Sequence, residues 1–228
     1  MRDWVEFYDC PHSIYVSERH KDVHYRDIAA QIVAFVPAPG ARVLDHGCGA
    51  AIHADKVAAV AAQLFLCDAA PSVRATITAR FAGNGKIRAV SPEVVECMAD
   101  GSLDLIVANS VVQYLTRDTL TALLALWRRL LAPNGVLIVA DVIPPEVGVA
   151  SDALALIRYA AAHGFLIAAL AGLIRTAASS YRRLQLTLSK ARYSEVEFLK
   201  LLRDAGFAAE RLPRNMEHNQ ARMTFRAR

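Results

Sequence analysis

Short apolar runs alternate with longer amphipathic stretches along the first 145 residues. The short runs have the length and apolar character of strands buried on both faces of a parallel sheet. Such strands are expected at 42–45, 64–67, 87–90, 103–108 and 136–141. The longer stretches have helical spacing and are expected to form helices at 20–36, 52–60, 71–81, 92–98 and 117–131. This alternation predicts an α/β fold with a doubly wound parallel sheet.

The pattern changes after residue 145. Residues 146–191 hold two helical runs and no strand pattern. The S-E-V-E sequence from Ser194 to Glu197 is a capping box that begins a helix, and Gly206 is placed to end it. Two short strands are expected at 210–212 and 223–227. The chain is therefore predicted to be one sheet domain with a helical insertion after its fifth strand.

The turn after the first predicted strand has a distinctive composition. The run R-V-L-D ends on Asp45, and Gly47 and Gly49 follow. Glycines let a backbone turn tightly and approach a ligand closely. The following helix presents unpaired N–H groups and partial positive charge at its start. Asp45 can accept hydrogen bonds from an ammonium group, which a dinucleotide does not supply.

This turn resembles motif I of the class I S-adenosylmethionine (SAM) methyltransferases, with Ala51 where the family usually has a third glycine. The resemblance covers about 40–145 and 194–228. It implies a Rossmann-like, seven-stranded, mostly parallel sheet with an antiparallel edge strand. It also implies methyl transfer from SAM, with S-adenosylhomocysteine (SAH) as product. The alternative is an ordinary strand–turn–helix of another α/β protein.

Further candidate cofactor residues follow the later strands. Asp68 lies 19 residues after Gly49, where an acid accepts hydrogen bonds from both ribose hydroxyls of an adenosine ligand. Alternatively, Asp68 is a helix N-cap. With the resemblance, the predicted cofactor contacts are Asp45, Gly47, Cys48, Gly49, Asp68, Ala69, Ser91, Pro92, Asn109 and Ser110.

A nicotinamide-dependent oxidoreductase is the competing enzyme class. Its fingerprint needs a small residue five positions after the first glycine, and this chain has Ile52 there. A third hypothesis is a SAM-binding accessory protein without catalysis, which acts at a membrane or a partner surface. It stays open because the chain has no evident general base after the fourth strand.

At that place many small-molecule methyltransferases carry a histidine, and this chain has Gln113 followed by Tyr114. A glutamine can orient a nucleophile but cannot deprotonate it. The N-terminal segment holds Tyr15, His20, His24 and Tyr25, and in the family such a segment often lines the acceptor pocket. The predicted catalytic residues are Tyr15, His20, Gln113 and Tyr114, and the predicted acceptor contacts are Tyr25, Asp141 and His218.

The predicted organisation has three parts: an N-terminal cap segment (1–40), a SAM-binding domain (41–145 and 192–228) and the insertion (146–191). Within the insertion, residues 153–174 are strongly apolar, and 175–192 carry five basic residues and no acid. This combination is typical of a membrane-surface element. It also fits a lid over the acceptor pocket, a homodimer interface or a plain core helix.

Bulk properties narrow the remaining classes. Hydrophobic residues make up 54% of the chain. Its four cysteines lack the spacing of metal ligands, so free thiols and no metal are expected. The N-terminus lacks an apolar signal segment, which favours a cytoplasmic, possibly membrane-associated, protein. Residues 157–228 hold 13 Lys and Arg but 5 Asp and Glu. No base-stacking basic patch is present, so the expected partner is a small-molecule or lipid acceptor and not nucleic acid.

Overall fold

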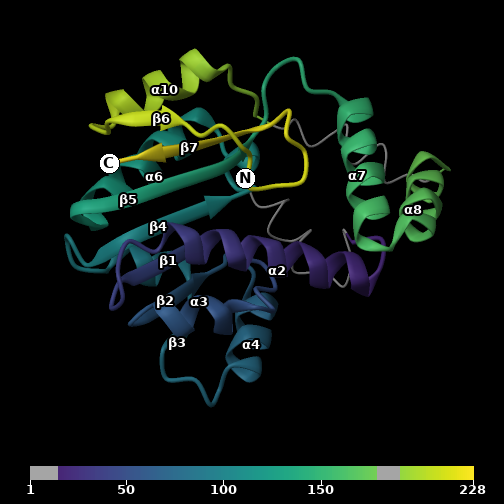
Figure 1. Ribbon diagram of the computed structural model, residues 1–228. Helices are drawn as coiled ribbons and strands as arrows, with labels where there is room; N and C mark the ends of the chain where they lie inside the picture. The colour runs from purple at the N-terminus through teal and green to yellow at the C-terminus, as the bar shows by residue number, and fades with distance from the viewer. Residues whose placement is uncertain (1–14, 179–190) are drawn as a thin grey trace.

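The computed structural model describes residues 15–178 and 191–228, and its centre is a seven-stranded sheet (Figure 1). The strands are β1 (Arg42–His46), β2 (Gln63–Cys67), β3 (Ile87–Val90), β4 (Leu103–Asn109), β5 (Leu131–Val142), β6 (Ala209–Arg211) and β7 (Met223–Ala227). Their order is β3-β2-β1-β4-β5-β7-β6. The first five strands are parallel, and β7 runs antiparallel to both of its neighbours. The predicted Rossmann-like, mostly parallel sheet is confirmed.

Helices cover both faces of this sheet. On one face lie α2 (Glu18–Phe35), α3 (Ala54–Val60) and α4 (Pro71–Arg80), which bury residues such as Ile32 and Ile77. On the other lie α5 (Pro92–Glu96), α6 (Arg117–Leu130) and α10 (Glu195–Asp204), with Trp127 and Phe198 fully buried. Each helix buries one apolar stripe against the sheet, as the spacing of its apolar residues predicts.

Several element boundaries follow from local side-chain chemistry. Ser194 and Glu197 form the predicted capping box of α10, and Gly206, with φ +85°, follows the end of that helix. Helix α3 begins at residue 54 and not at 52, because the preceding turn includes Ala51 at φ +39°. Strand β5 begins at Leu131 and not at 136, because Leu131 already pairs with β4 ahead of a bulge.

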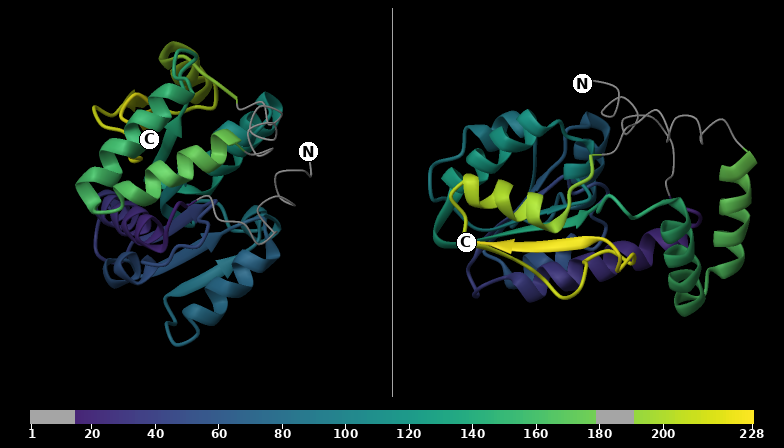
Figure 2. Two further views of the ribbon diagram at one scale, coloured as in Figure 1. Left: turned by 90° about the vertical axis from the view of Figure 1, so that its right-hand side faces the viewer. Right: turned by 90° about the horizontal axis from the view of Figure 1, so that it is seen from above.

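The insertion is a helical hairpin of α7 (Val149–His163) and α8 (Leu166–Ala178). The apolar stretch 153–174 does not form one continuous helix but is divided between α7 and α8. The run breaks at Gly164, whose φ of +77° is the left-handed conformation that glycine adopts at a helix end. The hairpin lies beyond the carboxyl ends of β1 and β4 (Figures 1 and 2). Residues 1–14 of the predicted cap segment and 179–190 of the predicted basic run lie outside the described residues.

The hairpin packs on the N-terminal half of α2, the part of that helix that extends past the sheet (Figure 1). The hydroxyl of Tyr159 donates a 2.8 Å hydrogen bond to Asp27, and Arg19 Nε donates one to the carbonyl of His163 at 3.2 Å. Helix α8 packs closely on the preceding segment, because a Cβ on Gly172 would lie 2.5 Å from Val16 Cγ1. The hairpin is thereby fixed to α2 by both polar and apolar contacts.

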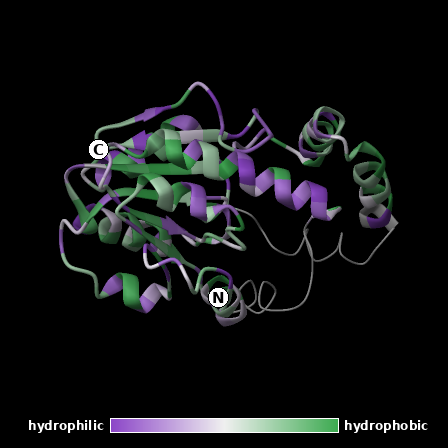
Figure 3. Ribbon diagram, turned by 60° about the horizontal axis from the view of Figure 1, so that its bottom comes forward, coloured by the Kyte–Doolittle hydropathy of each residue, from purple (hydrophilic) through white to green (hydrophobic). Residues whose placement is uncertain are grey.

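Helix α8 is rich in hydrophobic residues (Figure 3). Ile167 and Ile174 are 85% and 70% exposed, and Leu166 and Leu170 on the same helix are also exposed. Within the described part of the chain, no helix has both the length and the apolar character needed to cross a membrane. Several exposed apolar side chains on one helix are typical of a surface that contacts a protein, a membrane or a ligand.

Candidate functional site

The loop after β1 that contains Gly47 and Gly49, here the glycine loop (residues 47–51), folds back onto the end of β2. The N–H groups of Gly47 and Cys48 both donate to the carbonyl of Cys67, at 2.8 and 3.0 Å. Gly47 and Gly49 have φ values of +82° and +55°, which glycine adopts without strain. A Cβ on Gly47 would lie 2.4 Å from Cγ2 of Val111. The conformation and the close packing of this glycine loop therefore both require Gly47.

Two carboxylates lie beside the glycine loop. Asp68 accepts hydrogen bonds from the N–H groups of Gly49 (3.1 Å) and Ala70 (2.9 Å). Ala70, and not Asp68, is the N-cap residue of α4, so the alternative of Asp68 as a helix cap was wrong. Burial, together with the charge of Asp68, raises the pKa of Asp45 to about 7. No described Lys, Arg or His forms an ion pair with Asp45, so a bound cationic group would find a buried carboxylate ready to pair with it.

Tyr25 lies against the same loop. Its hydroxyl accepts a 2.8 Å hydrogen bond from the N–H of Ala50, and a Cβ on Gly49 would come within 2.6 Å of that oxygen. Burial raises the pKa of the Tyr25 phenol to about 12, so the hydroxyl stays protonated. The sequence-based prediction placed Tyr25 among the acceptor contacts. The structure instead brings it to the predicted cofactor loop.

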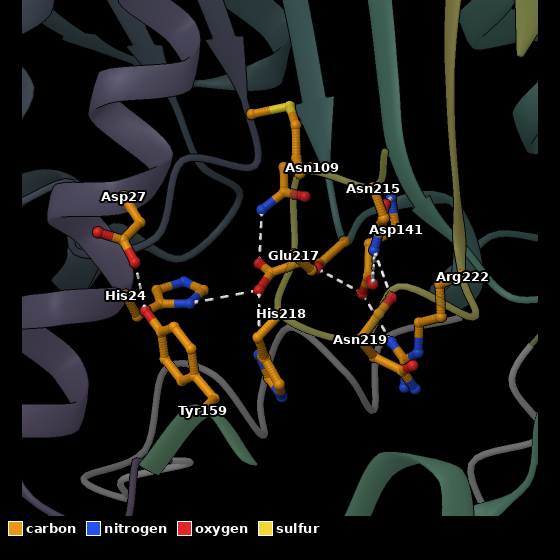
Figure 4. A network of polar contacts seen from close by, with 12 residues as sticks. His24, Asp27, Asn109, Asp141, Tyr159, Asn215, Glu217, His218, Asn219 and Arg222 are labelled. Atoms are coloured by element: carbon orange, nitrogen blue, oxygen red, sulfur yellow. Dashed lines mark hydrogen bonds and ion pairs between the residues drawn. The ribbon is translucent and has the colours of Figure 1, made fainter. Parts of the chain in front are cut away.

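A second polar cluster is centred on Glu217, in the loop between β6 and β7 (Figure 4). Asn109, at the carboxyl end of β4, donates its side-chain N–H to Glu217 Oε1 at 2.8 Å. His24 of α2 places Nδ1 3.4 Å from Oε2, and His218 Nδ1 lies 3.6 Å from the same oxygen. Two elements far from this loop in sequence, α2 and β4, thus converge on one carboxylate that is 7% exposed.

Charge pairing holds this cluster in its ionised form. Burial opposes ionisation of Glu217, but the charge of His24 and the hydrogen bonds around the carboxylate hold its pKa well below the usual value. For His24, burial works to lower the pKa, and the Glu217 carboxylate outweighs it, so the pKa of His24 lies above 6.5. The pair is therefore a buried imidazole whose basicity is set by a carboxylate.

A cavity of about 400 Å³ opens beside this pair. It lies between α2, α7 and the β6–β7 loop, and it is lined in part by His24, Asp27, Tyr159, Glu217 and His218. The His218 ring stacks on Tyr159 with a centroid distance of 5.1 Å. His218 therefore lines this cavity, and its contact with an acceptor stays a prediction.

The predicted N-terminal aromatic cluster also gathers here. The ring of Tyr15 lies 5.2 Å from the rings of both His20 and His24. His20 stacks on Phe165, at the start of the second hairpin helix, at 4.8 Å. Burial, followed by the charges of the two neighbouring histidines, lowers the pKa of His20 to about 4. His20 is thus a neutral, packed ring at physiological pH.

Asp141 has a different role from the one predicted. Its Oδ2 accepts hydrogen bonds from Arg222 Nη1 (2.6 Å) and Ser110 Oγ (2.7 Å), and it is 3% exposed. Arg222 also pairs with Asp152 of α7 at 2.8 Å. Ser110 and Asp141 both adopt positive φ, at +58° and +64°. Asp141 therefore anchors Arg222 and the hairpin and does not face an acceptor cation, which corrects the prediction.

The other predicted residues lie around these clusters. Gln113 donates to the carbonyl of Ser110 at 3.2 Å, and its buried Oε1 has no hydrogen-bond partner among the described residues. Tyr114 ends the short helix η1 (Val112–Tyr114). Ser91 is the N-cap of α5 and Pro92 its first residue, at the end of β3. The carbonyl of Ala69 accepts a hydrogen bond from Arg74 at 2.8 Å.

Sequence reasoning missed Glu217 and Arg222. The available signal for Glu217 was its position directly before His218, in a C-terminal third that holds few acids. No group of three or more His, Cys, Asp or Glu in residues 15–178 and 191–228 could hold a metal ion.

Comparisons with known proteins identify the class. Residues 43–135 match the model of a family described as a methyltransferase domain. No curated protein matches the chain. The glycine loop, Asp68 and Asn109 all fall inside the matched segment.

Solved structures share the fold at low sequence identity. Magnesium protoporphyrin IX methyltransferase from Synechocystis PCC 6803, with bound SAH, is 15% identical, with a TM-score of 0.58 over 98% of this chain and 90% of that one. A second structure is 1,6-didemethyltoxoflavin-N1-methyltransferase from Burkholderia thailandensis, with bound 1,6-didemethyltoxoflavin and SAH. It is 18% identical, with a TM-score of 0.57 over 90% of this chain and 77% of that one. Phosphoethanolamine N-methyltransferase 1 from Haemonchus contortus is 22% identical, with a TM-score of 0.53 over 64% of this chain and 32% of that one.

The matched segment of the chain is a methyltransferase domain, and it lies on a Rossmann-like sheet. Residues 43–135 of this chain thus form a methyltransferase domain, and the magnesium protoporphyrin IX methyltransferase that shares its fold was crystallised with SAH. Of the cofactors considered from the sequence, this match favours SAM over a nicotinamide. The residues present fit SAM, because Asp45 is a buried carboxylate that pairs with no cation among the described residues, and Asp68 lies beside it at the end of β2.

Proposed function

We propose that this methyltransferase transfers the methyl group of SAM to a small-molecule acceptor bound in the cavity beside Glu217. The observation that carries this proposal is the position of Asn109. It ends β4, the strand next to β1 and its glycine loop, and it donates directly to Glu217 in the cavity wall. Ligands of open α/β sheets bind at the carboxyl ends of strands, so both ligands would meet at this edge.

The predicted cofactor contacts have distinct roles in this proposal. Asp45 would pair with the ammonium group, and Asp68 would accept from the ribose hydroxyls. Gly47 and Gly49 would let the backbone approach, and the end of β3 would lie by the adenine. SAM, when bound, supplies an electrophilic methyl group on sulfur. The protein's own contribution is to align the acceptor with that group and to exclude water.

The acceptors of two similar structures support a small-molecule acceptor. One holds 1,6-didemethyltoxoflavin and another is named for magnesium protoporphyrin IX. Calorimetric titration with SAH, with NADH as control, tests the cofactor site directly. Binding of SAH alone is expected. Binding of NADH, or of neither, would contradict the assignment of the glycine loop.

Replacing Asp68 with alanine should weaken SAH binding by about 1–3 kcal/mol, because the ribose hydroxyls would lose their acceptor. Asp68 also holds the N–H groups of Gly49 and Ala70, so the variant is compared with Asp68→Asn, which keeps one acceptor oxygen. An intermediate loss for Asp68→Asn and a larger one for Asp68→Ala are expected by calorimetry. Wild-type affinity in both variants would remove Asp68 from the cofactor site.

We further propose that α8 contacts an anionic membrane surface. Its exposed face presents Ile167, Leu170 and Ile174, and the chain continues into residues 175–192, which carry five basic residues and no acid. Apolar side chains inserted at the headgroup level, with Lys and Arg beside them, are the two parts of peripheral membrane binding. A lipid-like acceptor would reach the enzyme by this route.

Replacing both Ile167 and Ile174 with glutamate should abolish flotation with vesicles that contain phosphatidylglycerol. Wild-type protein should float at low salt, should float less at high salt, and should not float with phosphatidylcholine alone. Val196→Glu is the matched control, since Val196 is 73% exposed on α10, a helix that packs on the sheet and not in the hairpin. A different outcome would instead assign this face to self-association: the wild-type protein does not float and is a dimer in solution, and the double variant is a monomer.

A further inference from the structure

We propose that His24, oriented by Glu217, is the general base of this enzyme, and that its acceptor is a compound with a hydroxyl nucleophile. This inference rests on the proposed function and names the acceptor class for that same site. It places the base on α2, the helix that holds the N-terminal histidines considered from the sequence, and its orienting carboxylate on the β6–β7 loop.

The first support is the arrangement of contacts around Glu217. Its Oε1 is occupied by Asn109 at 2.8 Å, and its Oε2 lies 3.4 Å from Nδ1 of His24. A carboxylate at Nδ1 fixes the imidazole with its proton on that nitrogen and leaves Nε2 as the basic one. The contacts of the His24 ring among the described residues are Glu217 at Nδ1 and the rings of Tyr15 and Tyr25, and His24 lines the cavity. The pair thus has the form of a base with its orienting partner.

The second support is the charge of the cavity wall. Both carboxylates there have partners already, since Glu217 is held by His24 and Asn109, and Asp27 accepts from the Tyr159 hydroxyl at 2.8 Å. Arg214 also lines the cavity. An ammonium acceptor would find no unpaired carboxylate in this wall. A neutral hydroxyl needs only one acceptor for its proton, which Nε2 of His24 provides.

The proton and electron balance of the transfer is complete. The hydroxyl oxygen forms a bond to the methyl carbon, and the carbon–sulfur bond breaks with its electron pair going to sulfur, which loses its positive charge. The proton of the hydroxyl passes to Nε2 of His24. The resulting imidazolium is stabilised by Glu217, and solvent later takes the proton.

The pH dependence follows from the groups that face His24 from each packed element. They are His20 and Asp27 on α2, Tyr15 before it, Asp141 on β5, Tyr159 on α7, and Glu217 and His218 in the β6–β7 loop. The carboxylates raise the pKa of His24, so its neutral form, the active base, should grow as pH rises through a value above 6.5.

Acylation by diethyl pyrocarbonate tests the base without an acceptor. The reagent attacks neutral imidazole nitrogens, and trypsin releases residues 22–26, in which His24 is the single histidine. We expect His24 to react with a midpoint above pH 6.5, and Glu217→Gln to lower that midpoint. Glu210→Gln, at an exposed ion pair on β6, should not shift it. A wild-type midpoint at or below 6.5, or no reaction of His24, would overturn the proposal even if Glu217→Gln failed to fold.

Methyl transfer to phenol, aniline and thiophenol tests the acceptor class. Wild-type enzyme should methylate phenol, and His24→Gln should lower that rate by about 10²–10⁴-fold, the range for general base catalysis. SAH affinity of the variant should stay within about twofold of wild type, which separates this proposal from failure of the cofactor site. Methylation of thiophenol alone, of none of the three, or of phenol equally by both proteins would overturn it.

Discussion

Replacing Gly47 with alanine should reduce SAH affinity by roughly 100-fold, which corresponds to about 2.7 kcal/mol. The backbone at Gly47 has a φ of +82°, and an added Cβ would lie 2.4 Å from Val111 Cγ2. A non-glycine residue in this region costs about 1–3 kcal/mol, and the clash also displaces the loop that the cofactor is expected to approach. Calorimetry with SAH and thermal unfolding measure the two effects.

Gly83→Ala is the matched control for this substitution. Gly83 lies in the turn before β3, an added Cβ there meets no atom within 4 Å, and its φ is not positive. The control should keep wild-type affinity and stability. If Gly47→Ala bound SAH as tightly as wild type, the ligand would not approach this turn.

Replacing Arg222 with methionine should destabilise the fold by about 3–5 kcal/mol at neutral pH, because Asp141 would remain buried and ionised without its partner. Arg222 contacts Asp141 at 2.6 Å and Asp152 at 2.8 Å, so the same change loosens α7. Chemical denaturation of wild type and variant measures the loss. Arg226→Met is the control, because Arg226 pairs with Glu210 at an exposed position and should cost no more than about 1 kcal/mol.

The pH dependence of this loss has a definite sign. Burial already raises the pKa of Asp141, Arg222 lowers it, and removal of Arg222 would raise it further. A carboxyl group with a raised pKa in the folded state favours folding at low pH and disfavours it as pH rises through that value. The deficit of Arg222→Met relative to wild type should therefore shrink as pH falls toward about 4. A deficit independent of pH would show that Asp141 is not the group left unpaired.

The fold could be predicted because its signals are local. Apolar runs of strand length, the turn glycines and the capping box at Ser194 each involve neighbours in sequence, and each was found where expected. The break at Gly164 was missed, because the apolar residues on both sides continue one pattern and only the backbone conformation separates α7 from α8.

The candidate site was predictable only in part, because its partners are distant in sequence. Asp68 was found from its spacing to Gly49, and the two are joined by a hydrogen bond. Glu217 was missed, because its contact with His24 spans nearly the whole chain and no local pattern marks it. The role of Asp141 was mistaken for the same reason, since Arg222 reaches it from a loop far along the sequence.

The 18 residues of α2 join two places that sequence motifs treat separately. Its inner half is held on the sheet by Ile28 and Ile32, while its outer half carries His24 and Tyr25. A helix of this length is a stiff rod of about 27 Å. A tilt of the whole helix about its inner half would therefore change two contacts together, that of Tyr25 with the glycine loop and that of His24 with Glu217. The glycine loop and the carboxylate of Glu217 are thus both contacted by one helix.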